Sequence, residues 1–175
     1  MIKSKDTVFE KKYSLNCQGT IIDLSTPKVM GIINLTPDSF YDGGKIKSDS
    51  DLLKSAETHM KAGADFLDLG AFSSRPGAQS ISESEEIKRL DQSVASIRKE
   101  FPKSILSIDT YRSKVVKQVL NQGANIINDI SGGTKDPEIF KVCAKENAPY
   151  VIMHNYLSPF NHQDLLNSGN VIKDV

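Results

Sequence analysis

Residues Val29 to Gly44, with the sequence VMGIINLTPDSFYDGG, carry the strongest indication of the fold. The apolar run of this stretch is interrupted at Asn34, and the following loop carries hydroxyl groups, two carboxylates and aromatic rings before a glycine pair. A short apolar run of this kind is typical of a buried strand. Polar groups placed where such a strand ends lie at the usual position of a site in an α/β protein. An ordinary strand and turn would explain Pro37 and the glycines, but not the rest of so specific a run.

Outward from this stretch, the chain repeats a short apolar strand, a polar loop and an amphipathic helix. Strands rich in Ile, Val, Leu and Phe are predicted over residues 29–34, 65–69, 104–109, 125–129 and 150–154. Strands that alternate with helices indicate a parallel sheet with right-handed crossovers. Residues 13–24, which turn around a polar cluster at 16–19, are predicted to form a β-hairpin ahead of this fold.

The helices between the strands carry their own boundary signals. Gly63 follows an apolar stripe in the position of a C-cap glycine. Ser82 and Glu85 have the spacing of a capping box. Asp136 and Pro137 predict an N-cap and a proline at the first helical position of a later helix.

Polar side chains at the predicted strand ends favour a barrel over an open sheet. They are Asn34, Asp68, Asp109, Asn128 with Asp129, and His154. In an open doubly wound sheet the ligand-binding groups cluster at a single switch point. Ligand-binding side chains from every strand are instead typical of a (β/α)₈ barrel. A complete barrel takes about 250 residues. We therefore predict an α/β fold with the first five βα units of a TIM barrel over residues 29–175, incomplete at its C-terminus, after an N-terminal segment 1–28 that carries the hairpin.

The amino-acid composition limits the kinds of function that the chain is expected to have. The chain has 175 residues, 38% of them hydrophobic, which is enough for one buried core. Because its 22 acidic and 22 basic residues balance, charge gives no case for a nucleic acid or an anionic membrane as partner. The N-terminal residues lack the apolar stretch of a signal peptide, and Cys17 and Cys143 do not suggest a zinc site. These features predict a cytoplasmic protein.

Four further segments hold candidate site residues, each with a simpler alternative. Arg75 lies in a Ser/Pro/Gly loop, where it can bind a phosphate or carboxylate or be merely solvated. Asp109 ends a buried strand, so it either faces a polar ligand or caps the next helix. Asn128 leads into a glycine turn that is ordinary by itself, and Met153 is either a core residue or the apolar wall of a flat pocket. His154 is assigned no chemistry.

Together these motifs, over residues 28–155, resemble the dihydropteroate synthases of the folate pathway. The match to the first signature of that family, at 29–44, is almost residue for residue. The second signature is usually written Gly-Glu-Ser-Thr-Arg-Pro-Gly; here Ala71 and Phe72 replace its first two residues and Ser74 replaces its threonine. Ser74 keeps the hydroxyl, whereas Phe72 loses a carboxylate.

The resemblance implies an activity and its residues. The family condenses 4-aminobenzoate with 6-hydroxymethyl-7,8-dihydropterin diphosphate, releases pyrophosphate, commonly uses Mg²⁺ and forms homodimers. The resemblance places Asn34 at the metal and the diphosphate, with Asp109, Asn128 and Met153 around the pterin. Catalytic roles fall to Asp38, Asp42 and Arg75. Two mobile loops that close over diphosphate and aminobenzoate also contain Thr36, Phe40, Ser74, Arg75 and Pro76.

Two alternatives stay open at this point. One is a methyltransferase that uses methyltetrahydrofolate, whose pterin barrel shares the aspartate and asparagine at strand ends but is not expected to carry the loop after Asn34. The other is a non-catalytic fragment that binds a pterin. Since later elements of the family pattern are absent, we expect the 175-residue piece alone to be inactive and its outer strands to be unpaired edges.

Overall fold

The computed structural model describes residues 13–36, 48–72 and 81–153. Its elements, in chain order, are β1 (Ser14–Cys17), β2 (Thr20–Asp23), β3 (Met30–Asn34), α1 (Asp49–Lys61), β4 (Phe66–Gly70), α2 (Glu83–Glu100), β5 (Ile105–Asp109), α3 (Ser113–Asn121), β6 (Ile126–Asp129), α4 (Glu138–Lys145) and β7 (Tyr150–Ile152). No helix within these ranges is both long and apolar enough to cross a membrane. The predicted order of strands and helices is confirmed.

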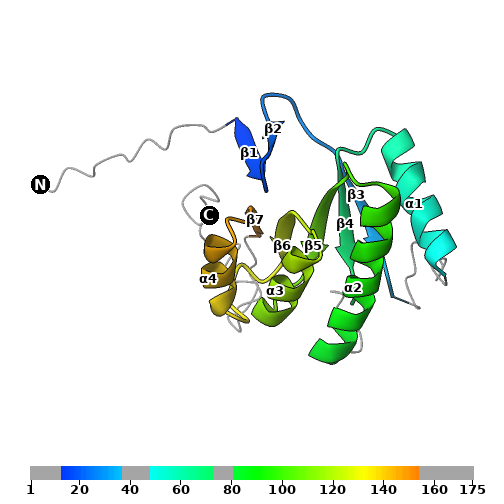
Figure 1. The fold of residues 1–175 in the computed structure, drawn as a ribbon. Coiled ribbons are helices and arrows are strands. Elements are labelled where there is room, and N and C mark those ends of the chain that lie inside the picture. The colour runs from blue at the N-terminus through cyan, green and yellow to red at the C-terminus, as the bar shows by residue number, and fades with distance from the viewer. Residues whose placement is uncertain (1–12, 37–47, 73–80, 154–175) are drawn as a thin grey trace, which may run out of the picture.

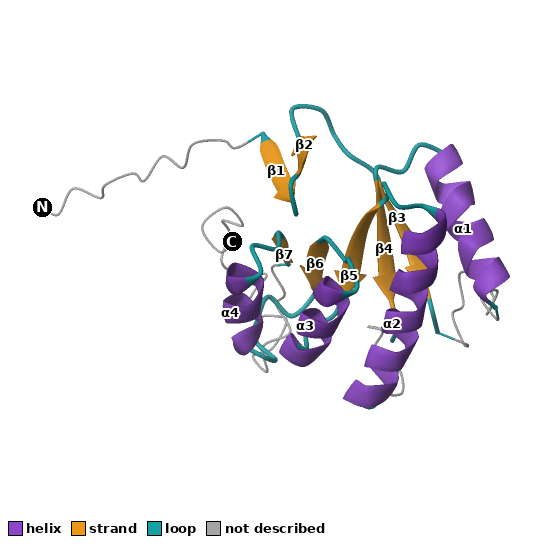
Figure 2. Cartoon of the chain, viewed as in Figure 1, coloured by secondary structure: helices purple, strands orange, loops and turns teal. Residues whose placement is uncertain are grey.

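Five parallel strands form the main sheet in the sequential order β3-β4-β5-β6-β7. The order does not reverse, so the described sheet has no switch point of the kind that defines an open doubly wound fold. The helices line up beside the strands in the same order and on the same side (Figures 1 and 2). Sequential parallel strands with every helix on one face are the arrangement of a (β/α) barrel wall, as predicted.

The outer face of the sheet packs against the helices. Alternate strand residues point this way, because successive side chains of a strand face opposite sides. The resulting core consists of Ile33, Leu67, Leu69, Leu106, Ile108 and Ile127 from the strands, with Leu52, Ala56, Leu90, Val94, Ile97, Val115, Val116, Val119 and Ile139 from the helices. Its continuous aliphatic packing is the main source of stability for this layer.

The hairpin β1–β2 covers the end of the sheet where the parallel strands begin, above the strands in Figure 1. Cys17 packs with Phe66, Ile105 and Ile126, which are the first residues of β4, β5 and β6. The antiparallel turn has positive φ at both central positions, 51° at Gln18 and 93° at Gly19, as a two-residue hairpin requires. The hairpin predicted at 13–24 is therefore confirmed, and it closes the amino end of the barrel wall.

Helix boundaries largely follow the sequence signals. Gly63 adopts φ +96° just after α1, and Ser82 Oγ accepts the backbone N–H of Glu85 at 3.2 Å. The prediction at α4 was one residue too early, since the helix begins at Glu138. Asp136 still accepts the N–H of Glu138 at 3.2 Å, but its other oxygen accepts the N–H of Ser113, the first residue of α3, at 2.7 Å. One carboxylate therefore serves the starts of two helices.

Arg98 ties the loops at the amino ends of the strands together. Its guanidinium, on α2, donates to the carbonyl oxygens of Gly123 at 2.8 Å and Ser104 at 2.5 Å, and to the side-chain oxygen of Asn125. Asn125 Oδ1 also accepts the N–H of Leu106 at 2.9 Å. A planar group with five donors suits this position, where several carbonyl oxygens converge.

Gly31 provides a test of the packing between β3 and α1. A Cβ at this position would lie 2.9 Å from both Cγ and Nδ1 of His59, which is closer than side chains pack. Gly31→Ala should therefore lower the free energy of unfolding by about 1–3 kcal/mol, measured by urea denaturation. The same change in a His59→Ala background should cost less than half as much, because the two closest atoms are removed and only the Cβ of residue 59, at 3.1 Å, remains.

Gly70 supplies the matched control in the neighbouring strand. A Cβ there would meet its nearest neighbours at 3.6–3.8 Å, which is ordinary contact. Gly70→Ala should leave stability nearly unchanged. Equal losses for the two alanine variants would contradict the assigned role of His59.

Candidate functional site

The inner face of the sheet changes from apolar to polar toward the carboxyl ends of the strands. In-register pairing aligns Asn34 with Gly70, Gly70 with Asp109, and Asp109 with Asn128. A Cβ on Gly70 would lie 3.6 Å from Asp109 Oδ2 and 3.8 Å from Asn34 Oδ1. The glycine thus leaves a gap into which an amide oxygen and a carboxylate oxygen converge from two strands.

Asp68 lies further from the carboxyl end of its strand than predicted. It was expected to end its strand, but β4 continues for two residues to Gly70, so Asp68 is an interior residue and is only 4% exposed. The strand extends further because its last residues still pair with β5. Asp68 Oδ2 accepts Asn128 Nδ2 at 3.1 Å, while Oδ1 is buried without a hydrogen-bond partner. Burial raises the pKa of Asp68, against the opposing effects of the neighbouring Ser107 hydroxyl and the Asn128 amide.

Asp109 is the most perturbed carboxyl group of the site. Burial, with the nearby carboxylates of Asp68, Glu86 and Asp129, raises its pKa to about 7. Its Oδ1 is buried and has no hydrogen-bond partner. The alternative role as a helix cap is wrong, because α3 starts at Ser113 and Asp136 accepts that first N–H. A buried carboxyl group with an unused oxygen in a row of polar residues is a candidate ligand-binding group.

The adjacent pair Asn128–Asp129 divides between the two faces of the sheet. Asn128 faces inward, whereas Asp129 faces the helices and is fully buried. The carboxylate of Asp129 accepts the N–H groups of Ser131 at 2.7 Å and Gly133 at 2.9 Å, and the hydroxyl of Tyr150 at 2.5 Å. Its oxygens are thus used to shape the glycine turn, which is a structural role.

Sequence reasoning missed Glu86, which is fully buried on α2. It accepts the Thr110 hydroxyl at 2.5 Å and pairs with Arg112, whose other nitrogen donates to the carbonyl of Ile81 at 2.9 Å. These bonds fix the loop immediately after Asp109. The available signal was the spacing: Glu86 lies four residues before Leu90 and so falls on the apolar stripe of its helix.

The other predicted site residues divide between described and undescribed parts of the chain. Thr36 is half-buried just after β3. Met153 follows β7 with 44% of its surface exposed, so it is not a core residue. The predicted residues of the two loops and the last strand end lie outside the described residues; they are Asp38, Phe40, Asp42, Ser74, Arg75, Pro76 and His154. Within the described ranges, no three His, Cys, Asp or Glu side chains gather as metal ligands.

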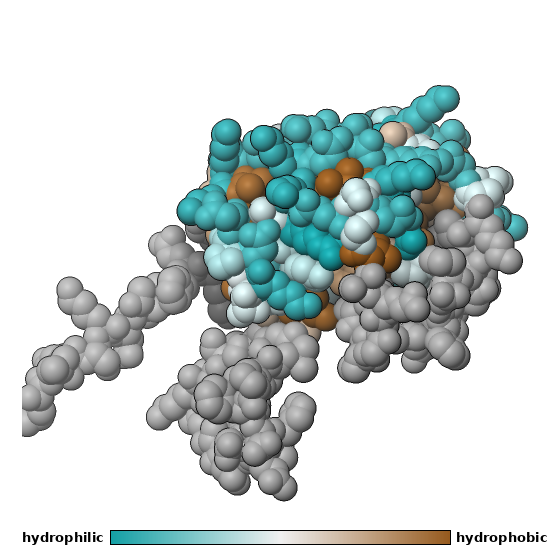
Figure 3. Space-filling view, turned by 90° about the horizontal axis from the view of Figure 1, so that it is seen from below, coloured by the Kyte–Doolittle hydropathy of each residue, from teal (hydrophilic) through white to brown (hydrophobic). Residues whose placement is uncertain are grey.

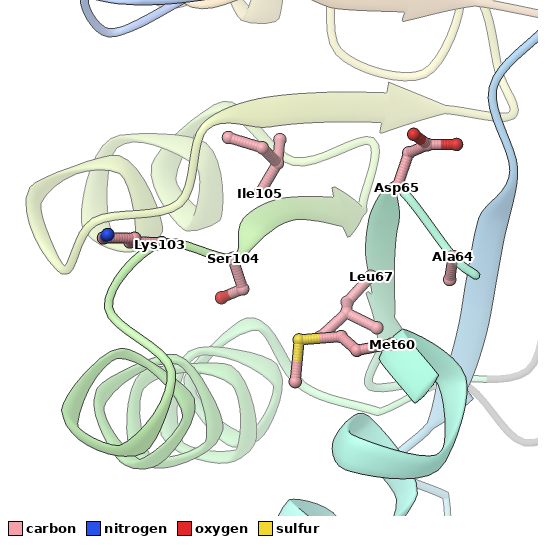
Figure 4. Close-up of a pocket in the computed structure, with 7 residues that line it drawn as sticks. All are labelled: Met60, Ala64, Asp65, Leu67, Lys103, Ser104 and Ile105. Atoms are coloured by element: carbon pink, nitrogen blue, oxygen red, sulfur yellow. The ribbon is translucent and has the colours of Figure 1, made fainter. Parts of the chain in front are cut away.

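The two ends of the barrel wall differ in character. Figure 3 shows the molecule from below the view of Figure 1, the end toward which the strands run, and the described surface there is mainly hydrophilic with separate apolar patches. At the opposite end lies a pocket of about 290 Å³, shown in Figure 4 and lined by Met60, Ala64, Asp65, Leu67, Lys103, Ser104 and Ile105. In barrels the amino end of the strands serves stability and the carboxyl end carries the site. The pocket is therefore separate from the row around Asp109.

The raised pKa of Asp109 predicts the sign of a pH effect on stability. The folded state holds this proton up to about pH 7, whereas the unfolded state releases it near pH 4. The free energy of unfolding should therefore fall as the pH rises from about 4 to 7. Asp109→Asn should remove the contribution of Asp109 to this fall and stabilise the protein at pH 8 by about 1–3 kcal/mol, measured by chemical denaturation.

Asp65 serves as a control of opposite sign. The N–H of Val29 and the ammonium of Lys28 lower its pKa. Asp65→Asn should therefore lower stability at neutral pH, with the loss shrinking as the pH falls through the acid range. Parallel pH curves for wild type and Asp109→Asn would contradict the account of Asp109.

Comparison with known proteins assigns the chain to a family. The family described as "Pterin binding enzyme" matches residues 30–175. A dihydropteroate synthase of Synechocystis sp. is 42% identical over 147 residues, which cover 84% of this chain and 50% of that protein. The chain thus spans about half the length of this curated relative.

Solved structures give the same result. Yersinia pestis dihydropteroate synthase in a sulfonamide drug complex superposes with a TM-score of 0.75 at 36% identity, over 85% of this chain and 56% of the other. Xanthomonas albilineans dihydropteroate synthase with 4-aminobenzoic acid gives 0.74 at 32% identity, over 89% and 59%. Since the family match and the strand-end polar row coincide, this chain belongs to the pterin-binding enzyme family.

Proposed function

We propose that the gene product carrying this sequence is a dihydropteroate synthase. It would join 4-aminobenzoate to 6-hydroxymethyl-7,8-dihydropterin diphosphate and release pyrophosphate. The observation that carries the proposal is the buried Oδ1 of Asp109, which has no hydrogen-bond partner and lies between Gly70 and Asn128 in the row at the carboxyl end of the sheet. Buried polar atoms left unpaired in this way are costly unless a polar ligand meets them.

The edge of a pterin ring carries hydrogen-bonding groups that would pair with the polar side chains at the carboxyl end of the sheet. The pyrimidine part of a pterin presents amino and ring N–H donors beside ring-nitrogen acceptors. An ionised Asp109 would accept from the donors, whereas the amide of Asn128 both donates and accepts. Asn128 is held in place by its bond to Asp68. Met153, exposed at the end of β7, would supply an apolar wall for the flat ring.

Asn34 fits the predicted role at the metal and the diphosphate. Mg²⁺ takes oxygen ligands and is usually bound by one or two protein groups together with substrate phosphates and water. Asn34 Oδ1 faces the gap at Gly70, opposite Asp109 Oδ2. When bound there, Mg²⁺ would neutralise charge on the leaving diphosphate. Asn34 would hold the metal, and its position beside Asp109 would set the diphosphate next to the pterin.

The remaining roles fall to Thr36, just after β3, and to residues of two loops outside the described ranges. Asp38, Asp42 and Arg75 would act at the reacting groups, with Thr36, Phe40, Ser74 and Pro76 closing over diphosphate and aminobenzoate. The enzyme's contribution to such a displacement is to orient the amine toward the carbon that carries the diphosphate and to stabilise the departing charge. The homodimer and the cytoplasmic location stay predictions.

The first test concerns pterin binding. Asp109→Ala and Asn128→Ala should each weaken binding of a neutral pterin by about 1–3 kcal/mol, because ligand groups are left unpaired in a closed pocket. Isothermal titration calorimetry on the gene product measures the change. Asn121→Ala, at the exposed end of α3, is the control and should bind normally.

The same calorimetry can be repeated over a range of pH to measure how pterin affinity depends on the ionisation of Asp109. Since the carboxylate form of Asp109 accepts from the pterin, affinity should rise with pH and level off above about 7. Asp109→Ala should lose this dependence. Unchanged affinity in both alanine variants would remove these residues from the pterin site.

A second test concerns Arg75. Diphosphate and carboxylate groups both accept paired hydrogen bonds from a planar guanidinium, so geometry should matter beyond charge. Arg75→Lys should lose much of the kcat/KM that Arg75→Ala loses, measured by steady-state kinetics of dihydropteroate formation. A lysine variant close to wild type would reduce Arg75 to a general electrostatic role.

A further inference from the structure

Most of the described ionisable side chains near the carboxyl ends of the strands are carboxylic acids, which do not attract the anionic groups of the proposed substrates. Asp68, Asp109, Asp129 and Glu86 all lie at or beside this end of the sheet, and all are buried or half-buried. Arg112 is committed to Glu86. A diphosphate and an aromatic carboxylate are both anions, so their approach requires cations that are still available.

Lys135 is such a cation. It is exposed, and it lies in the loop between β6 and α4, six residues after the strand ends. Its ammonium nitrogen lies 4.3 Å from the centre of the Tyr111 ring. Among the described residues it forms no ion pair, since the nearby carboxylate of Asp136 accepts the N–H groups of Ser113 and Glu138.

Tyr111 is itself held in place. It follows Asp109 by two residues, and its ring meets that of Phe72 edge-on, with the ring centres 5.4 Å apart at 79°. The guanidinium carbon of Arg112 lies 5.2 Å from its centre, and Arg112 Nη2 donates to its hydroxyl at 3.3 Å. Loops after β4, β5 and β6 thus meet at one aromatic ring.

This arrangement pre-positions an ammonium without neutralising it. A cation over an aromatic face at an exposed site gains a weak attraction, which is enough to bias its position but is far weaker than a buried ion pair. The ring carries no net charge, so the ammonium keeps its positive charge, and the N–H donors that point away from the ring stay available to oxygen acceptors. An anion that arrives at the strand ends would therefore find a cation already oriented.

We propose that Lys135, positioned by the ring of Tyr111, binds an oxyanion of the substrates at the mouth of the barrel wall. The group would be the diphosphate of the pterin substrate or the carboxylate of aminobenzoate, which share the same hydrogen-bonding chemistry. The inference rests on the proposed function and assigns a residue to its anionic substrates.

The experiment compares Lys135→Gln with Lys141→Gln in the gene product. Lys141 is an exposed lysine of α4 that pairs with Glu138 at 2.5 Å, so it controls for the loss of one positive charge nearby. Calorimetry measures binding of pyrophosphate and of a neutral pterin, and kinetics measure KM for aminobenzoate. Lys135→Gln should weaken pyrophosphate binding, or raise the KM for aminobenzoate, about tenfold, with pterin affinity unchanged.

Further variants separate positioning from charge. Lys135→Arg should restore binding to within about threefold, since it keeps a cation with several donors. Tyr111→Phe should behave like wild type, whereas Tyr111→Leu should weaken the same ligand about three- to fivefold because the ring is lost. Thermal unfolding of each variant confirms that it is folded.

The outcomes are distinct. A change confined to pyrophosphate assigns the diphosphate, and a change confined to aminobenzoate assigns the carboxylate. Equal effects of the two glutamine variants, or no effect of Lys135→Gln on either anion, overturn the role of Lys135. A wild-type protein that binds no pterin contradicts the proposed function itself, which the pterin arm reveals independently of Lys135.

Discussion

Parallel pairing of β3 to β6 brings one residue from each strand into a single row at the carboxyl end of the sheet: Asn34, Gly70, Asp109 and Asn128. A shift of one residue in any strand would turn its polar residue toward the helices and an aliphatic one inward. The aliphatic core on the outer face prevents such a shift, because Ile33, Leu69 and Ile108 would then leave it. The register that packs the helices is thus the same register that assembles the site.

Buried carboxylates fall into two groups. Asp129 and Glu86 face the helices or the loops and are matched by backbone N–H groups, hydroxyls or a guanidinium. Such bonds offset the cost of burial and fix the loops that follow β5 and β6. Asp68 and Asp109 face the barrel interior and each keep one oxygen unmatched. The carboxylates whose oxygens all have partners within the protein therefore fix loops, whereas those with an unpaired oxygen lie where a ligand can supply the missing hydrogen bond.

Local sequence patterns predicted the elements, because hydrophobic periodicity and capping residues act within a few residues of one another. They also predicted that Asp109 and Asn128 lie at strand ends. They did not predict that Asp68 is interior, that Asp129 faces away from Asn128, or that Asp136 serves two helices. Each of these depends on which segments meet in space, and Glu86 acquires its partners only when α2 packs beside the loop after β5. The roles in the two undescribed loops rest on resemblance alone.

The hairpin at the amino end has a consequence for the order of events during synthesis. It leaves the ribosome before the strands that it packs against, and its contact from Gln18 to Asn125 joins residues 107 positions apart. At a translation rate of about 5–20 residues per second, the hairpin waits for about 5–20 s before that partner exists. During this time Cys17 has none of its buried neighbours from β4 to β6 in place. A two-stranded hairpin is only marginally stable alone. The hairpin that closes the barrel wall is therefore synthesised before the strands that it covers, and the nascent chain carries an uncovered thiol and apolar strand until β6 has emerged.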